Sequence, residues 1–147
     1  MSALGEFQGL MKGFWSRYGW TIAWAALLFI LSSISDLSPP LHVFEWEDKL
    51  HHFLAYTPLG WLLMRSMVWR GSSTRKALWF AIALGTLYGI SDEIHQYFVP
   101  GRMMDWTDAV ADAGGIALGS WLFHHRRKAT TAAEKMNAET KRKTAAF

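Results

Sequence analysis

The chain has 147 residues, of which 51% are hydrophobic and 18% charged, with a formal net charge of +3. This length allows one domain, and the absence of cysteine excludes a disulfide framework, a thiolate metal site and a cysteine nucleophile. Nearly all charges lie outside a few apolar blocks, and nine tryptophans suit a protein whose aromatic rings lie at the two interfaces of a membrane. We expect no nucleic-acid partner.

The N-terminal part of the chain predicts an interfacial helix followed by a first membrane span. Within residues 1–17, the apolar residues Leu4, Phe7 and Met11 recur at helical spacing, which is typical of an amphipathic helix on a membrane surface. Residues 18–35 carry no charge and approach the about 20 residues that a spanning helix needs.

Three further apolar stretches are shorter than a membrane span. To cross a core of about 30 Å, each must include charged neighbours at one end, which predicts helices near 48–68, 77–97 and 105–123. The expected fold is therefore all-α, an integral membrane bundle of four transmembrane helices over residues 18–123. The basic segment 124–147 is expected to be a disordered tail near anionic lipid, or simply a charge cluster that fixes orientation.

Lysine and arginine predict that both termini are cytoplasmic. Thirteen of the 15 lysines and arginines fall on the side that holds both termini and the 65–76 loop, whereas Lys49 and Arg102 fall on the other. Nine of the 12 acidic residues fall on this outer side. Four spans agree with having both ends inside.

Small residues predict where two of the spans approach each other. Gly85 and Gly89 on the third span and Gly115 and Gly119 on the fourth form two G-x-x-x-G patterns. Such patterns allow close contact between helices, here between the third and fourth spans.

Polar residues gather at the outer ends of the second and third spans. Asp48, His52 and Tyr56 share one face of the second span. Asp48 can be explained as an N-terminal cap, whereas His52 lies one turn deeper, where no cap is needed. Asp92 and Glu93 lie at the C-terminal end of the third span, where the helix dipole disfavours anions. The structural alternative to a functional role is that the helix ends early and both acids lie in a solvated loop.

The residues that follow extend this polar region. Asp92, His95 and Gln96 are expected to share one face of the helix, with Glu93 about a quarter turn away. The next pair, Pro100–Gly101, predicts a turn.

The fourth span begins with three aspartates on one face. Asp105, Asp108 and Asp112 lie within about 60° of one another on a helical wheel. Asp105 and Asp108 also resemble a capping pair, which is the structural alternative for both. Asp112 lies about 10 Å inside the helix and needs a partner, a proton or water.

The outer ends of the spans hold six acids against Lys49 and Arg102, which leaves four negative charges uncompensated. A divalent cation, protonated carboxyls or a water-filled cleft would each account for them. The metal stays unknown, because the chain has no HExxH signature and because Glu93 and His95, two residues apart, do not face one ion together.

Two motifs carry the polar residues of this region. They are Asp48-Lys49-x-x-His52-Phe53-x-x-Tyr56-x-x-Leu59-Gly60 and Tyr88-Gly89-Ile90-Ser91-Asp92-Glu93-x-His95-Gln96-x-Phe98-Val99-Pro100-Gly101-Arg102, followed by Asp105, Asp108, Asp112 and Gly115. Over residues 48 to about 120, the chain resembles the VanZ-like family. Members are small bacterial multi-span membrane proteins, named for one that confers low-level resistance to the glycopeptide teicoplanin. The resemblance implies the bacterial cytoplasmic membrane and a role in the cell envelope, without giving a reaction.

We weigh two functions. The first is an outward-facing site that binds or modifies an envelope lipid or a lipid-linked cell-wall precursor, in which a histidine acts as general acid or base and basic residues hold a phosphate or carboxylate. The candidate catalytic residues are His52, Asp92, Glu93, His95 and Asp112. The candidate substrate-binding residues are Lys49, Tyr56, Gln96, Arg102, Asp105 and Asp108. Arg102 has an alternative role, a structural pairing with Asp105 or Asp108.

The second function is non-enzymatic, a proton- or ion-linked transporter or a lipid-sensing accessory protein, in which the carboxylates carry protons or ions. Four spans without a duplicated half would need an oligomer to form a transporter. No G-x-S-x-G motif supports a covalent nucleophile.

Overall fold

The computed structural model describes residues 3–35, 46–68 and 73–144, and within them it contains four helices and no strand. The helices are α1 (Ala3–Ser32), α2 (Glu47–Met67), α3 (Thr74–Tyr97) and α4 (Trp106–Thr144). The prediction of an all-α fold is confirmed. The ends of α2 and α3 lie within a few residues of the predicted spans.

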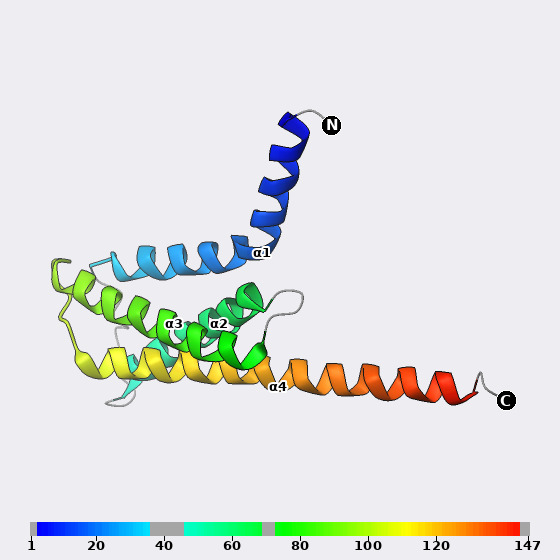
Figure 1. The fold of residues 1–147 in the computed structure, drawn as a ribbon. Helices are drawn as coiled ribbons and strands as arrows, with labels where there is room; N and C mark the ends of the chain where they lie inside the picture. Colours follow the sequence, from blue (N-terminus) through cyan, green and yellow to red (C-terminus); the bar gives the residue numbers. More distant parts are fainter. Residues whose placement is uncertain (1–2, 36–45, 69–72, 145–147) are drawn as a thin grey trace.

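The helices form an up-and-down bundle in which α2 and α4 make the most extensive contact. The third helix packs on α4 as well, and α1 contacts α2 and α3. Successive helices run in opposite directions, so the ends of α1 and α3 and the starts of α2 and α4 lie at one end of the bundle (Figure 1). The predicted polar region is therefore assembled at this end.

The first helix differs from the prediction of two separate segments. It is continuous, with its C-terminal half along the bundle and its N-terminal half bent away from it (Figure 1). The two predicted segments meet between residues 17 and 18, where the chain has no proline or turn signal. The helix therefore continues across this boundary. The apolar side chains of the bent half, such as Phe7 and Trp15, are exposed.

Glycines in α4 bring its backbone against α2. A Cβ atom added at Gly115 would overlap the carbonyl oxygen of Phe53, and one at Gly119 would overlap that of Thr57. The prediction that this glycine pair faces the third span is therefore wrong. The two helices lie so close because glycine, which lacks a side chain, occupies both crossing positions.

The glycines of α3 do face α4, as predicted. A Cβ atom at Gly85 would lie 2.7 Å from the side chain of Ile116, and one at Gly89 would lie 2.9 Å from the Cβ atom of Asp112. The helix α4 is thus held between α2 and α3, with small residues at different positions on each side.

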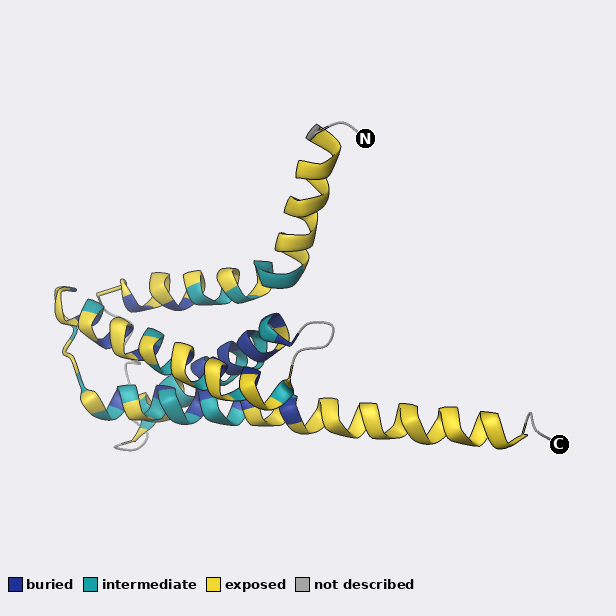
Figure 2. Ribbon diagram, in the orientation of Figure 1, coloured by how far each residue is buried: buried dark blue, intermediate teal, exposed yellow. Residues whose placement is uncertain are grey.

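The basic C-terminal segment was expected to be disordered, but α4 continues as one helix to Thr144. Residues 125–144 are exposed and project beyond the bundle (Figure 2). Alanine, glutamate and lysine favour a helix here even without a packing partner. Glu139 and Lys143, one turn apart, add an ion pair of 3.0 Å.

Within the described residues, only α3 is long and apolar enough to cross a membrane by length and composition. Its exposed side chains are largely apolar or aromatic, and they include Trp79, Phe80, Leu84, Leu87, Ile90, Ile94 and Tyr97. The other three crossings stay a prediction.

Candidate functional site

The polar end of the bundle centres on His52, which contacts carboxylates from two other helices. Its Nδ1 atom lies 2.9 Å from Oδ1 of Asp112 on α4 and 3.8 Å from Oε1 of Glu93 on α3. Asp112 is 0% and Glu93 1% exposed. Three helices therefore bring one imidazole and two fully buried carboxyl groups together, and we call these three residues the inner trio.

The inward face of α3 consists of Asp92, Glu93 and Gln96, all of which are buried. The Gln96 amide donates hydrogen bonds to Asp92 (3.2 Å) and to Glu93 (3.3 Å). Glu93 lies about a quarter turn from Asp92, as predicted, but the structure places it on the inward face, where the sequence predicted His95 instead. On a helical wheel, Glu93 lies about 100° from Asp92 on the side that turns toward α2 and α4.

His95 lies outside the cluster, although the sequence predicted it on the same face as Asp92. Its Nε2 atom is 3.0 Å from the hydroxyl oxygen of Ser33, and its ring stacks on that of Phe29 with centroids 4.5 Å apart. His95 therefore faces α1, and the structure separates it from the other candidate catalytic residues.

Lys49 lies at the rim, where its ammonium group contacts three carboxylates. The Nζ atom lies 2.8 Å from Asp48, 3.1 Å from Asp105 and 3.1 Å from Asp108. These three aspartates form the outer trio. All three N–H donors of the ammonium group have an acceptor, so Lys49 differs from the free anion-binding cation that the sequence suggested. Trp46, rather than Asp48, holds the N-cap position of α2, and Asp48 accepts the backbone N–H of Lys49 at 2.9 Å within the first turn.

Asp105 caps the start of α4, as one of its two predicted roles required. Its Oδ1 atom accepts the backbone N–H (2.8 Å) and the hydroxyl (2.7 Å) of Thr107. These bonds, with a further one from Lys49, lower the pKa of Asp105 to about 2. The backbone N–H of Asp105 in turn donates to Glu93 at 3.0 Å, which ties α3 to the start of α4. Thr107 was not among the predicted residues, although an Asp-x-Thr pattern at a helix start indicates a contact of this kind.

Three oxygen atoms next to the inner trio are buried and have no hydrogen-bond partner among the described residues. They are the hydroxyl of Tyr56, Oδ1 of Asp92 and Oδ2 of Asp112. The Tyr56 hydroxyl is close enough to both aspartates to interact with each electrostatically. Leaving a buried polar atom unpaired costs about 1–3 kcal/mol, so a group that satisfied these oxygens would stabilise the bundle.

Arg102 binds the end of α1. Its Nε and Nη2 atoms donate to the carbonyl oxygens of Ile34 and Leu31, each at 3.2 Å. The last carbonyls of a helix lack internal partners, and this contact differs from both roles that the sequence suggested, an anion site and a pairing with the aspartates. The predicted turn before Arg102 is confirmed, since Gly101 has a φ of 80°.

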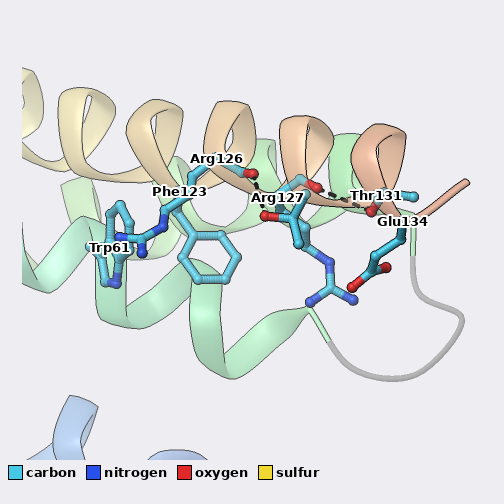
Figure 3. A pocket seen from close by; sticks show the side chains of 7 residues that line it. Trp61, Phe123, Arg126, Arg127, Thr131 and Glu134 are labelled. Atoms are coloured by element: carbon cyan, nitrogen blue, oxygen red, sulfur yellow. Dashed lines mark hydrogen bonds between the residues drawn. The ribbon is translucent and has the colours of Figure 1, made fainter. Parts of the chain in front are cut away.

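A cavity of about 300 Å³, which the sequence did not predict, lies toward the other end of the α2–α4 contact. It is lined by Trp61, Phe123, Arg126, Arg127, Thr130, Thr131 and Glu134. The guanidinium of Arg126 lies 5.8 Å from the centre of the Trp61 ring, and the Trp61 and Phe123 rings meet edge to face (Figure 3). Trp61 is nine residues, or about 13 Å, beyond His52 along α2, so this basic pocket is separate from the inner trio.

The family model VanZ/LLP1 matches residues 12–127. The match covers most of α1, all of α2 and α3, and α4 to just beyond the bundle. The comparison with curated proteins found no match, and the comparison with solved structures found none.

Proposed function

The chain belongs to the VanZ/LLP1 family, and from this premise we propose that it is a multi-pass protein of the bacterial cytoplasmic membrane whose outward-facing site binds or modifies a cell-envelope lipid or a lipid-linked cell-wall precursor. The observation that carries the proposal is the meeting of His52, Glu93 and Asp112 inside the bundle. Ionisable groups at membrane depth mark substrate or ion pathways. A link to glycopeptide resistance belongs to the same proposal.

The membrane placement rests on the surface of the helices and on the distribution of charge. The outer surfaces of α1 and α3 carry many exposed apolar side chains, an arrangement that soluble monomers rarely have. With four crossings, the basic loop at 65–76 and both termini lie in the cytoplasm.

Reporter fusions after residue 147 test this orientation. We expect a fluorescent GFP fusion and an inactive alkaline phosphatase fusion, because GFP fluoresces in the cytoplasm and the phosphatase requires an oxidising compartment. A dark GFP fusion with an active phosphatase fusion would contradict the orientation and the outward-facing site with it.

His52 is the residue best suited to proton transfer. Asp112 holds its Nδ1 atom at 2.9 Å, and Glu93, at 3.8 Å, is the second candidate base. Tyr56, Asp92 and Gln96, buried beside the inner trio, and the outer trio at the rim are the candidate contacts of the bound lipid. A phosphate of the ligand would reach Lys49 only by displacing one of the three aspartates around it.

Mass spectrometry of the lipids that copurify with the protein tests the proposal. The parent protein should retain a phosphate-bearing envelope lipid, or convert it when supplied, and His52→Ala should abolish the conversion or change the retained lipids. Glu139→Gln, an exposed change in the C-terminal part of α4, is the control. Identical lipid profiles for the parent and His52→Ala, with no conversion by either, would remove the proposal.

A proton- or ion-linked transporter or lipid sensor is the second candidate. The unpartnered carboxyl oxygens of Asp92 and Asp112 favour it, because buried ionisable groups at membrane depth can line the path of a proton or an ion. Four helices would require an oligomer for this role. Proton-coupled flux in liposomes that Asp112→Asn abolishes would favour this candidate over the first.

A further inference from the structure

The inner trio has the donor set of a metal site. One ligand atom from each of His52, Glu93 and Asp112 lies within 4.8 Å of the others. We propose that these residues bind a divalent transition-metal ion such as Zn²⁺ or Mn²⁺. The proposal deepens the proposed function and rests on it, since the ion would lie in the same site and would supply a Lewis acid for a lipid phosphate.

The outer trio shows how the chain balances carboxylates where no metal is needed. Asp48, Asp105 and Asp108 also offer three ligand atoms within 4.8 Å of one another, but the Lys49 ammonium group contacts all three. Within the described residues, the ionic partner of Glu93 and Asp112 is His52 rather than a lysine or an arginine. The inner trio is also more deeply buried, so its negative charge has the greater need of a bound cation.

Unpartnered oxygens beside the inner trio point to a ligand independently of the acidic cluster. Oδ2 of Asp112, Oδ1 of Asp92 and the hydroxyl of Tyr56 have no hydrogen-bond partner among the described residues, although these side chains are 0%, 5% and 2% exposed. A metal ion, with the water it carries, would satisfy oxygens of this kind. Gly89 allows the Asp112 carboxyl group to occupy this position, because a Cβ atom there would lie 2.9 Å from Cβ and 3.1 Å from Oδ2 of Asp112.

The chemistry of the donors selects the class of metal. An imidazole nitrogen with carboxylate oxygens suits Zn²⁺ or Mn²⁺ better than Ca²⁺ or Mg²⁺, which prefer oxygen alone. The distances of 2.9 Å and 3.8 Å from His52 Nδ1 to its two carboxylate partners bracket the about 3.3 Å edge of a tetrahedron with 2.0 Å bonds. With Nδ1 on the metal, Nε2 would face Oδ2 of Asp108 at 3.9 Å, as in carboxylate–histidine–metal arrangements.

Elemental analysis of the full-length protein, purified in detergent without chelators, tests the proposal. We expect about one Zn or Mn per chain in the parent and in Asp105→Asn, which changes the outer trio only. We expect His52→Ala and Asp112→Asn to lose the metal. Refilling protein stripped with EDTA measures the affinity for Zn²⁺ or Mn²⁺, which each inner-trio variant should weaken at least about tenfold.

Two further measurements distinguish loss of the metal site from failure to fold. Elution volume and helical circular dichroism identify variants that fail to fold, and Glu93→Gln, which keeps the shape of the side chain, replaces any that do. The proposal is overturned if the stripped parent binds neither ion, or if Asp105→Asn weakens binding as much as Asp112→Asn. A bound metal without any effect on lipids would leave this inference standing and count against the proposed function, whereas a lipid effect in a metal-free protein would do the reverse.

Discussion

The two ends of the α2–α4 contact differ in whether their charged side chains are buried or exposed. At the polar end, acidic side chains of α3 and α4 are buried, and Glu93, Asp108 and Asp112 among them meet His52 and Lys49 of α2. At the other end, Arg126 and Arg127 stay exposed, and Arg126 lies over the face of Trp61. Charges that remain in water can serve orientation and lipid contact at little cost, whereas buried charges need partners, protons or ions.

This contrast locates function in the molecule. Buried carboxyl groups lower stability unless they are paired, so their concentration at the polar end indicates a functional role there. The exposed cations of the basic end need no catalytic or binding role to explain them, because positive charge next to a membrane already fixes orientation and attracts anionic lipid. We therefore expect substitutions at the two ends to separate activity from stability.

The largest effect should come from the crossing between the two ends. In Gly119→Ala, the new Cβ atom overlaps the carbonyl oxygen of Thr57, so α2 and α4 must move apart along their whole contact. We expect the free energy of unfolding to fall by about 3 kcal/mol, measured by thermal unfolding in detergent. Gly13→Ala is the control, because nothing lies within 4 Å of its Cβ position. Equal stability of the two variants would show that α2 and α4 do not approach closely at this point.

The next largest effect should separate the two ends by activity. His52→Ala removes the group at the centre of the polar end, whereas Arg126→Ala removes an exposed cation at the basic end. We expect His52→Ala to lose about 100-fold or more of the site's activity, the usual size of a general acid–base contribution, and Arg126→Ala to keep most of it. Complementation of a deletion strain measures the activity of both variants. Similar losses in the two would contradict the assignment of function to the polar end.

The sequence predicted the helices of the bundle and the gathering of acids at one end, because these follow from apolar length and from the spacing of charges. It could not decide which side of α3 faces the bundle. The sets Asp92, Glu93, Gln96 and Asp92, His95, Gln96 each cover about 100° of a helical wheel. The position of α1, which covers His95, decides between them.

Two other features depended on long-range packing in the same way. The glycines of the fourth span could serve any neighbouring helix, and only the arrangement of the bundle directs Gly115 and Gly119 to α2. Arg102 follows a turn rich in nearby acids, yet its guanidinium donates to the carbonyl oxygens of Leu31 and Ile34 at the end of α1. The sequence shows which groups need partners, and the fold determines which partners they find.

A smaller effect is expected at Arg102, which joins the polar end to α1. In Arg102→Ala the carbonyl oxygens of Leu31 and Ile34 lose a donor, so we expect a loss of about 1 kcal/mol in unfolding free energy. Arg102→Lys should recover part of this loss, since an ammonium group can still reach one carbonyl. Thermal unfolding and complementation measured together test the assignment. Full stability of Arg102→Ala with loss of activity would indicate an anion-binding role instead.

The smallest effect concerns the response of the two ends to acid. Asp105 has a pKa lowered from 3.8 to about 2 by its bonds to Thr107 and Lys49. Because the folded pKa lies below the unfolded one, the stabilisation is complete above pH 3.8 and is lost as the pH falls through about 2. Its side chain is 40% exposed, which limits the size of this contribution.

The test compares melting temperature with pH, from 6 down to 2, in the parent, in Asp105→Asn and in Glu139→Gln. Asp105→Asn should show a shallower loss of stability in acid than the parent, since its amide has no proton to bind. Glu139 pairs with Lys143 in the tail, where both side chains are at least 70% exposed, so Glu139→Gln should follow the parent curve. If Glu139→Gln made the loss of stability in acid as shallow as Asp105→Asn does, exposed and partly buried acids would respond to pH alike. The lowered pKa of Asp105 would then not explain the response of the polar end to acid.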